Sequence, residues 1–121
     1  MAKQSIYILG INPDGSLQLS DNGTTEAHPG DIVEWYVYEN SCVNIISSIH
    51  DTSKTEVFKP KPYRKYDHES KQWMWRGQVR EDYEGKSATE HYSIYYTKKG
   101  GTAVYTDDPR IQVNSVINND V

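Results

Sequence analysis

Apolar and polar positions alternate through most of this chain, with the period of two that is typical of half-buried β-strands. The clearest run follows Pro29 and Gly30, which together favour a turn. Three side chains share one face of this run and three share the other: Val33, Trp35 and Val37 against Glu34, Tyr36 and Tyr38. We expect the first face to be buried and the second exposed, with Trp35 at the centre of the core.

Shorter alternating runs predict further strands, separated by turn signals such as Asn12-Pro13-Asp14-Gly15. These runs lie at residues 5–11, 17–19, 43–49, 73–79, 91–96, 103–105 and 111–114. The sequence has no helical period, internal repeat or low-complexity segment. About seven short strands predict one all-β domain over residues 1–121, an antiparallel sandwich or barrel.

Two segments break the regular pattern. Residues 55–72 are predicted to form a long irregular excursion, because Pro60 and Pro62 oppose a continuous ladder and long excursions often carry function. Val57 and Phe58, at its start, suit a short strand or a plug into the core. Residues 115–121 are predicted to form a frayed tail.

Composition narrows the function classes. The formal net charge is −4, and no stretch has the length and hydropathy of a membrane span. Nucleic acid is an unlikely partner because the chain has no strong basic excess. The one cysteine excludes an intrachain disulfide, and the first residues lack a signal-peptide pattern. We therefore expect a cytoplasmic protein, unless an N-terminal signal precedes this sequence.

Four short motifs resemble the cupredoxin family, the plastocyanin- and azurin-like sandwiches. They are Gly30-Asp31-Ile32-Val33-Glu34-Trp35, Val43-Asn44-Ile45, the strand from His91 to Tyr96, and Ile111-Gln112-Val113-Asn114. The likeness covers about residues 29–46 and 90–114. It implies an antiparallel Greek-key β-sandwich of cupredoxin-like type.

The resemblance also implies that the copper site is gone. The family's copper needs two imidazoles, a thiolate and a weak axial Met. On this alignment Val43 and Lys99 replace the histidines, Tyr96 replaces the cysteine and Val104 falls near the methionine. None of these side chains does the ligand's job. We therefore expect no cofactor and no electron transfer.

Two other kinds of site remain as alternatives. A copper or zinc site of non-standard ligands would use His50, His68 and Cys42, although the histidines are too widely spaced for a compact metal motif. A small hydrolase would need a Ser, His and acid set or a carboxylate pair, and no nucleophile-elbow motif is present. The hydrolase ranks last, so we expect no enzyme activity.

The favoured hypothesis is a non-catalytic binding or interaction module. Rings and cations gather where the regular pattern is interrupted, and this surface is our candidate binding site: Tyr63, Arg64, Tyr66, Trp73 and Arg76. Its ligand would be a protein, a peptide or a carbohydrate. A bare sheet edge would in addition favour a homodimer through strand pairing, which Lys98 and Lys99 oppose.

Overall fold

Two sheets of five strands each form the protein, as a computed structural model shows for residues 2–52, 56–82 and 88–114. The first sheet has the order β2-β1-β4-β7-β6 and the second β3-β10-β8-β5, with β9 also paired to β8. The strands are β1 (Lys3–Ile11), β2 (Leu17–Leu19), β3 (Thr24–Ala27), β4 (Ile32–Val37), β5 (Val43–Asp51), β6 (Tyr63–Asp67), β7 (Gln72–Gln78), β8 (Ala88–Lys98), β9 (Val104–Asp107) and β10 (Arg110–Val113). None of the described residues lies in a helix, so no described helix could cross a membrane.

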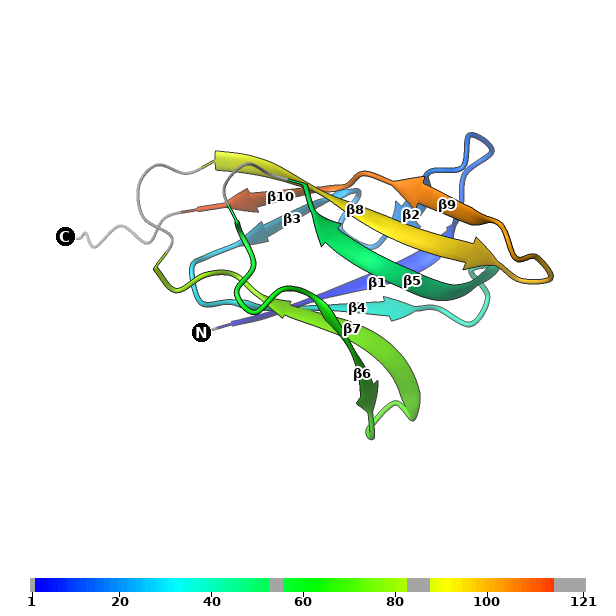
Figure 1. Cartoon of the computed structure of the whole chain (residues 1–121), viewed down its shortest axis with the longest axis horizontal. Coiled ribbons are helices and arrows are strands. Elements are labelled where there is room, and N and C mark those ends of the chain that lie inside the picture. The colour runs from blue at the N-terminus through cyan, green and yellow to red at the C-terminus, as the bar shows by residue number, and fades with distance from the viewer. Residues whose placement is uncertain (1, 53–55, 83–87, 115–121) are drawn as a thin grey trace.

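The all-β prediction is confirmed, but the prediction of purely antiparallel sheets is wrong. Strands β1 and β4 are parallel, and so are β3 and β10. The sequence runs showed strand positions but not which strands become neighbours. The chain crosses between the two sheets, so strands far apart in sequence lie side by side (Figure 1).

The core lies between the two sheets and draws on both. Trp35 of β4 is fully buried, and its ring makes edge contacts with Phe58 and Tyr92 at centroid separations of 5.7 and 5.6 Å. Its indole Nε1 donates a hydrogen bond of 3.1 Å to the Tyr92 hydroxyl, which satisfies a polar group that would otherwise be costly to bury. The expected place of Trp35 at the core centre is confirmed.

Two residues of the face that was expected to be exposed, Glu34 and Tyr36, are also buried, whereas Tyr38 is 51% exposed as expected. Glu34 is only 6% exposed and accepts a hydrogen bond of 2.9 Å from the Tyr36 hydroxyl. Lys3 and Arg76 lie 3.5 and 3.8 Å from its carboxylate oxygens, and the Tyr7 ring stacks on Tyr36. Burial, with the Glu34 contact, raises the pKa of the Tyr36 hydroxyl. Period-two patterning failed here because polar groups can be buried when they satisfy one another.

The Gly30-Asp31 turn holds the start of β1 beside the start of β4. Gly30 has φ of +89°, which favours glycine. The Asp31 carboxylate accepts hydrogen bonds from the backbone N–H groups of Ala2 and His28, at 3.0 and 2.9 Å. This buried carboxylate therefore fixes the parallel pairing of β1 and β4 at its first residues.

The predicted excursion at residues 55–72 is wrong in its second half. Strand β6 pairs antiparallel with β7, with Tyr66 opposite Trp73. Pro60 and Pro62 precede this hairpin and do not interrupt it, while Phe58 plugs the core as expected and bridges to Val79. In Figure 1 the hairpin projects from the body of the two sheets. The predicted strand count of about seven is also too low, and the predicted tail lies outside the described residues.

Candidate functional site

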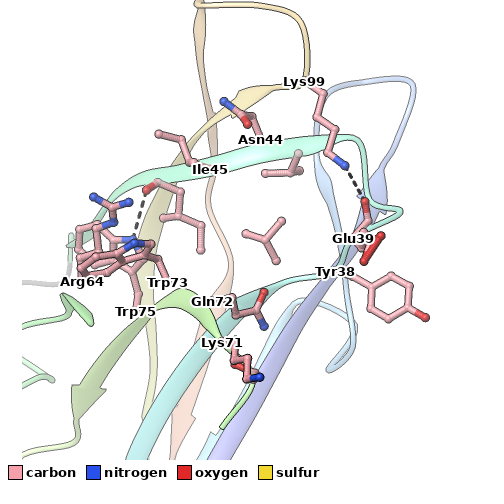
Figure 2. A pocket seen from close by; sticks show the side chains of 14 residues that line it. Tyr38, Glu39, Asn44, Ile45, Arg64, Lys71, Gln72, Trp73, Trp75 and Lys99 are labelled. Atoms are coloured by element: carbon pink, nitrogen blue, oxygen red, sulfur yellow. Dashed lines mark hydrogen bonds between the residues drawn. The ribbon is translucent and has the colours of Figure 1, made fainter. Parts of the chain in front are cut away.

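A cleft of about 490 Å³ opens at one end of the molecule, between the β6–β7 hairpin and the chain from the end of β4 into β5 (Figure 2). Its lining comes from both sheets and from three turns. The residues are Val37, Tyr38, Glu39, Val43, Asn44, Ile45, Ile46, Arg64, Ser70, Lys71, Gln72, Trp73, Trp75 and Lys99. Its volume lies in the range of small-molecule sites in proteins.

Trp73 forms an exposed aromatic wall of the cleft. Its side chain is 54% exposed, which is unusual for so large an apolar ring. The Arg64 guanidinium lies over the ring at 4.4 Å from the centroid, and the Tyr66 ring meets Trp73 at 5.3 Å in an edge contact. Cross-strand pairing in the hairpin creates this cluster, because Tyr66 is directly opposite Trp73 and Arg64 opposite the next residue of the same parity.

Trp75 connects the hairpin to the second sheet. It is half-buried against the core, and its Nε1 donates a hydrogen bond of 3.2 Å to the carbonyl oxygen of Ile46 on β5. The dashed line at the left of Figure 2 marks this bond. This bond joins the β6–β7 hairpin of the first sheet to β5 of the second sheet. It therefore fixes the position of the Trp73 wall relative to the β5 wall of the cleft.

The inner surface of the cleft is largely apolar. Val43 and Ile46 are buried, whereas Ile45 is 45% exposed beside them. Val37, at the end of β4, adds a partly buried methyl surface. Apolar walls with a few polar groups at the rim are the usual composition of a site for a small organic ligand.

The turn between β6 and β7 carries part of the rim. The Asp67 carboxylate accepts hydrogen bonds from the Ser70 hydroxyl at 2.7 Å and from the Glu69 backbone N–H at 3.2 Å. The Ser70 bond, more than any other contact, holds the pKa of Asp67 below its ordinary value. Lys71 then adopts φ of +58°, and its side chain lies at the lower edge of the cleft in Figure 2.

The opposite rim is formed by Lys99, the first residue of the turn after β8. Its Nζ donates a hydrogen bond of 2.7 Å to the backbone carbonyl oxygen of Glu39. The backbone N–H of Lys99 also donates to the carbonyl oxygen of Cys42 at 2.9 Å. Two turns about 60 residues apart in sequence are thereby fixed against each other beside the cleft.

The five predicted surface residues separate into two groups. Arg64 and Trp73 line the cleft, and Tyr66 supports Trp73 from the side. Tyr63 and Arg76 are cross-strand partners whose parity differs from that of Arg64 and Trp73, so they lie on the other face of the hairpin. Arg76 there faces the Glu34 carboxylate at 3.8 Å. The prediction thus combined two faces of one hairpin.

The residues of the alternative metal site have separate neighbours. The His50 ring meets Tyr95 at 5.3 Å, and the His68 ring meets Tyr66 at 5.0 Å. Cys42 is an exposed thiol in the β4–β5 turn. Within residues 2–52, 56–82 and 88–114, no three His, Cys, Asp or Glu side chains group in a way that could hold a metal ion.

The positions aligned with copper ligands also lack metal-binding side chains. Val43 is buried in the cleft wall and Val104 is 55% exposed on β9. Tyr96 is buried, and its hydroxyl donates to the carbonyl oxygen of Gly15. Lys99 serves as the rim cation described above.

A serine and a carboxylate do meet on β8. The Ser93 hydroxyl donates a hydrogen bond of 2.7 Å to the Asp108 carboxylate. Among the described residues no hydrogen bond joins a histidine ring to either of them.

Sequence reasoning missed half of the cleft. The β5 wall and the Lys99 rim come from distant segments, and no local pattern links them to the hairpin. Lys71 lies in the turn of the hairpin itself and was not among the predicted residues. One signal did exist, since Trp73 and Trp75 share strand parity and therefore one face. Trp75 packs against the core on that face, whereas Trp73 lies beyond the edge of the core and lines the cleft. Only the three-dimensional arrangement of the sheets shows this difference.

The fold is that of an all-β sandwich with two mixed sheets. No family model and no curated protein matches the sequence. Among solved structures, the crystal structure of the inclusion body protein PixA from Burkholderia cenocepacia J2315 is similar, with a TM-score of 0.50 and 14% sequence identity. The match covers 96% of this chain and 97% of that chain. At this identity the likeness concerns the fold alone.

Proposed function

We propose that this protein is a non-catalytic binding module that takes a small ring-bearing ligand in the cleft beside Trp73. The observation that carries the proposal is the 54% exposed Trp73 ring at the wall of a cleft of about 490 Å³. A tryptophan in water forfeits the free energy that burial of its apolar surface would give, and a ring stacked on it recovers part of that.

The cleft has the features of a pre-formed site. Arg64 and Tyr66 hold the Trp73 ring from one face and one edge, so little side-chain entropy is lost when a ligand stacks on it. The bond from Trp75 to the Ile46 carbonyl keeps the two walls at a fixed separation. Rings of this kind recognise sugars, aromatic side chains and aromatic small molecules by stacking.

We further propose that the scaffold is a cupredoxin-like Greek-key sandwich without copper. The chain passes between the two sheets from β2 to β3, β3 to β4, β4 to β5, β5 to β6 and β7 to β8, and β3 comes to lie beside β10 from the other end of the chain. These connections between sheets support a Greek-key topology. The G-D-x-V-x-W resemblance falls on β4 at the centre of the first sheet. Val43, Tyr96, Lys99 and Val104 supply no type 1 copper ligand set.

The three tryptophans make the ligand proposal testable by NMR. Each indole N–H gives one signal, and Trp35 serves as an internal control because it is fully buried and bonded to Tyr92. Titration with 2-naphthylmethanol or cellotriose, an aromatic and a sugar probe, should shift the Trp73 and Trp75 signals and leave the Trp35 signal in place.

A matched pair of variants separates the cleft from the rest of the surface. Trp73→Ala should weaken probe binding about fivefold or more, since loss of one stacked ring costs about 1–3 kcal/mol and 1.4 kcal/mol is tenfold. Tyr7→Ala removes a ring that is 42% exposed on the outer face of β1, away from the cleft, and should leave binding unchanged. Unmoved Trp73 and Trp75 signals with both probes at millimolar concentration would refute the proposal.

A further inference from the structure

Three cations surround the cleft although the whole chain is acidic. The formal net charge of the protein is −4, yet Arg64, Lys71 and Lys99 line this cleft with Glu39 as its one carboxylate. Figure 2 shows Arg64 and Lys99 at opposite ends and Lys71 below them. The local charge of the cleft is therefore opposite in sign to that of the protein.

None of these cations forms an ion pair with a carboxylate within the described part of the chain. The ion pairs there are formed by Lys3, Arg76 and Arg80. Lys99 donates only to a neutral carbonyl oxygen, that of Glu39. Among the described residues the three rim cations are thus not ion-paired, and they outnumber the one carboxylate of the lining, that of Glu39.

Arg64 is the cation best arranged for a specific contact. Its guanidinium carbon lies over the Trp73 ring at 4.4 Å from the centroid, a cation–π contact. This contact uses the positive charge and not a hydrogen bond, and a guanidinium has five N–H donors that can bind a carboxylate in pairs. The Trp73 ring restricts where those donors lie before any ligand arrives.

We infer that the cleft binds an aromatic acid: a flat apolar ring that packs beside Trp73 and the Val43 wall, with a carboxylate held by Arg64 at the rim. This inference rests on the proposed function and adds the charge and the ring type of the ligand. The apolar walls formed by Val37, Val43 and Ile46 favour an aromatic ring over a sugar ring, because sugar hydroxyls buried there would lack partners.

A charge series of one ring tests the inference. The probes are 2-naphthoate, 2-naphthylmethanol and 2-naphthylmethylammonium, which carry a negative charge, no charge and a positive charge on the same ring. Dissociation constants come from the Trp73 and Trp75 indole signals. We expect 2-naphthoate to bind at least tenfold more tightly than the alcohol, the ammonium to bind most weakly, and added salt to reduce the difference.

Variants then locate the charge. Arg64→Gln should remove most of the preference for 2-naphthoate over 2-naphthylmethanol. Loss of the Arg64 contact with the Trp73 ring weakens both probes alike and cancels from this ratio, and continued binding of 2-naphthylmethanol shows that the cleft is intact. Arg64→Lys should restore only part of that preference, because a lysine lacks the paired donors. Lys61→Gln is the matched control, an exposed cation before β6 that does not line the cleft, and should bind both probes as the unaltered protein does.

The possible outcomes distinguish the inference of an aromatic acid from the proposed function of a ring-binding cleft. Equal affinity for 2-naphthoate and 2-naphthylmethanol, or an Arg64→Gln variant that still prefers the acid, would overturn the inference and leave a ring-binding cleft. Tighter binding of digalacturonate than of 2-naphthoate would overturn the aromatic part in favour of a sugar acid. Failure of every probe to shift the indole signals would overturn both.

Discussion

The hydrogen bond between Trp35 and Tyr92 gives a direct test of the core. Tyr92→Phe removes one hydroxyl and keeps the ring, so the edge contacts of that ring with Trp35 and Phe58, at 5.6 and 6.1 Å, can remain. The indole Nε1 of Trp35, which donates to this hydroxyl at 3.1 Å, is then left buried without its acceptor. Leaving one buried donor unsatisfied costs about 1–3 kcal/mol.

A loss of this size is measurable and leaves the variant folded under native conditions. Domains of this size have a free energy of unfolding of about 6–18 kcal/mol, from about 0.05–0.15 kcal/mol per residue. For a domain of this size each kcal/mol lost lowers the midpoint of thermal unfolding by about 4 °C, so a loss of about 2 kcal/mol should lower it by about 8 °C. Urea unfolding followed by tryptophan fluorescence should show a lower midpoint with an unchanged slope.

Two comparisons make the result specific. Tyr105→Phe removes the hydroxyl of a tyrosine that is 39% exposed on β9, and should change stability by less than about 0.5 kcal/mol. The double variant Trp35→Phe with Tyr92→Phe should lose less than the two single changes added together, because the partners interact. If Tyr92→Phe is as stable as the unaltered protein, the bond does not stabilise the core and our account of it is wrong.

Four further predictions follow from other parts of the structure. Burial, more than the nearby carboxylates, raises the pKa of Asp107 in the folded protein. Above the ordinary pKa of 3.8 the charged carboxylate is therefore less favourable in the folded state than in the unfolded state, and stability falls as the pH rises. Asp107→Asn should raise the unfolding temperature at pH 7 and have little effect at pH 3. Gly77→Ala should cost about 1–2 kcal/mol in urea unfolding, because the new Cβ would lie 3.2 Å from Pro62 and 3.3 Å from Phe58, whereas Gly101→Ala, with its nearest atom at 3.8 Å, should be nearly neutral. Light scattering should give a monomer of about 13.9 kDa, because bulges interrupt the β5 edge, and twice that mass would indicate strand pairing instead. Cu(II) added to the purified protein should produce no intense blue colour, and such a colour would show that a type 1 site exists.

The sequence predicted the strands better than their arrangement. Alternation identified β1, β4 and β10, and an apolar, β-branched run identified β5, because each strand has at least one face in the core. It missed β6, whose side chains Tyr63 to Asp67 are exposed or half-buried and show no contrast between faces. A strand that lies at the edge of the core carries little of the signal that periodicity detects.

The candidate site was half predicted for a similar reason. Arg64, Tyr66 and Trp73 lie within one hairpin, so a local concentration of rings and cations was enough to select them. Lys99 reaches the cleft from the end of another sheet, and its place depends on a bond to the Glu39 carbonyl that no sequence pattern encodes. Glu39 and Lys99 are 60 residues apart in sequence and become neighbours only through tertiary packing.

The most direct test of the central claim is a crystal structure of the protein with 2-naphthoate bound. We predict that the naphthalene ring lies in the cleft beside Trp73, with its carboxylate facing the Arg64 guanidinium. Density for the ligand on another surface, with the cleft empty, would contradict the claim that this hairpin and β5 form a binding site.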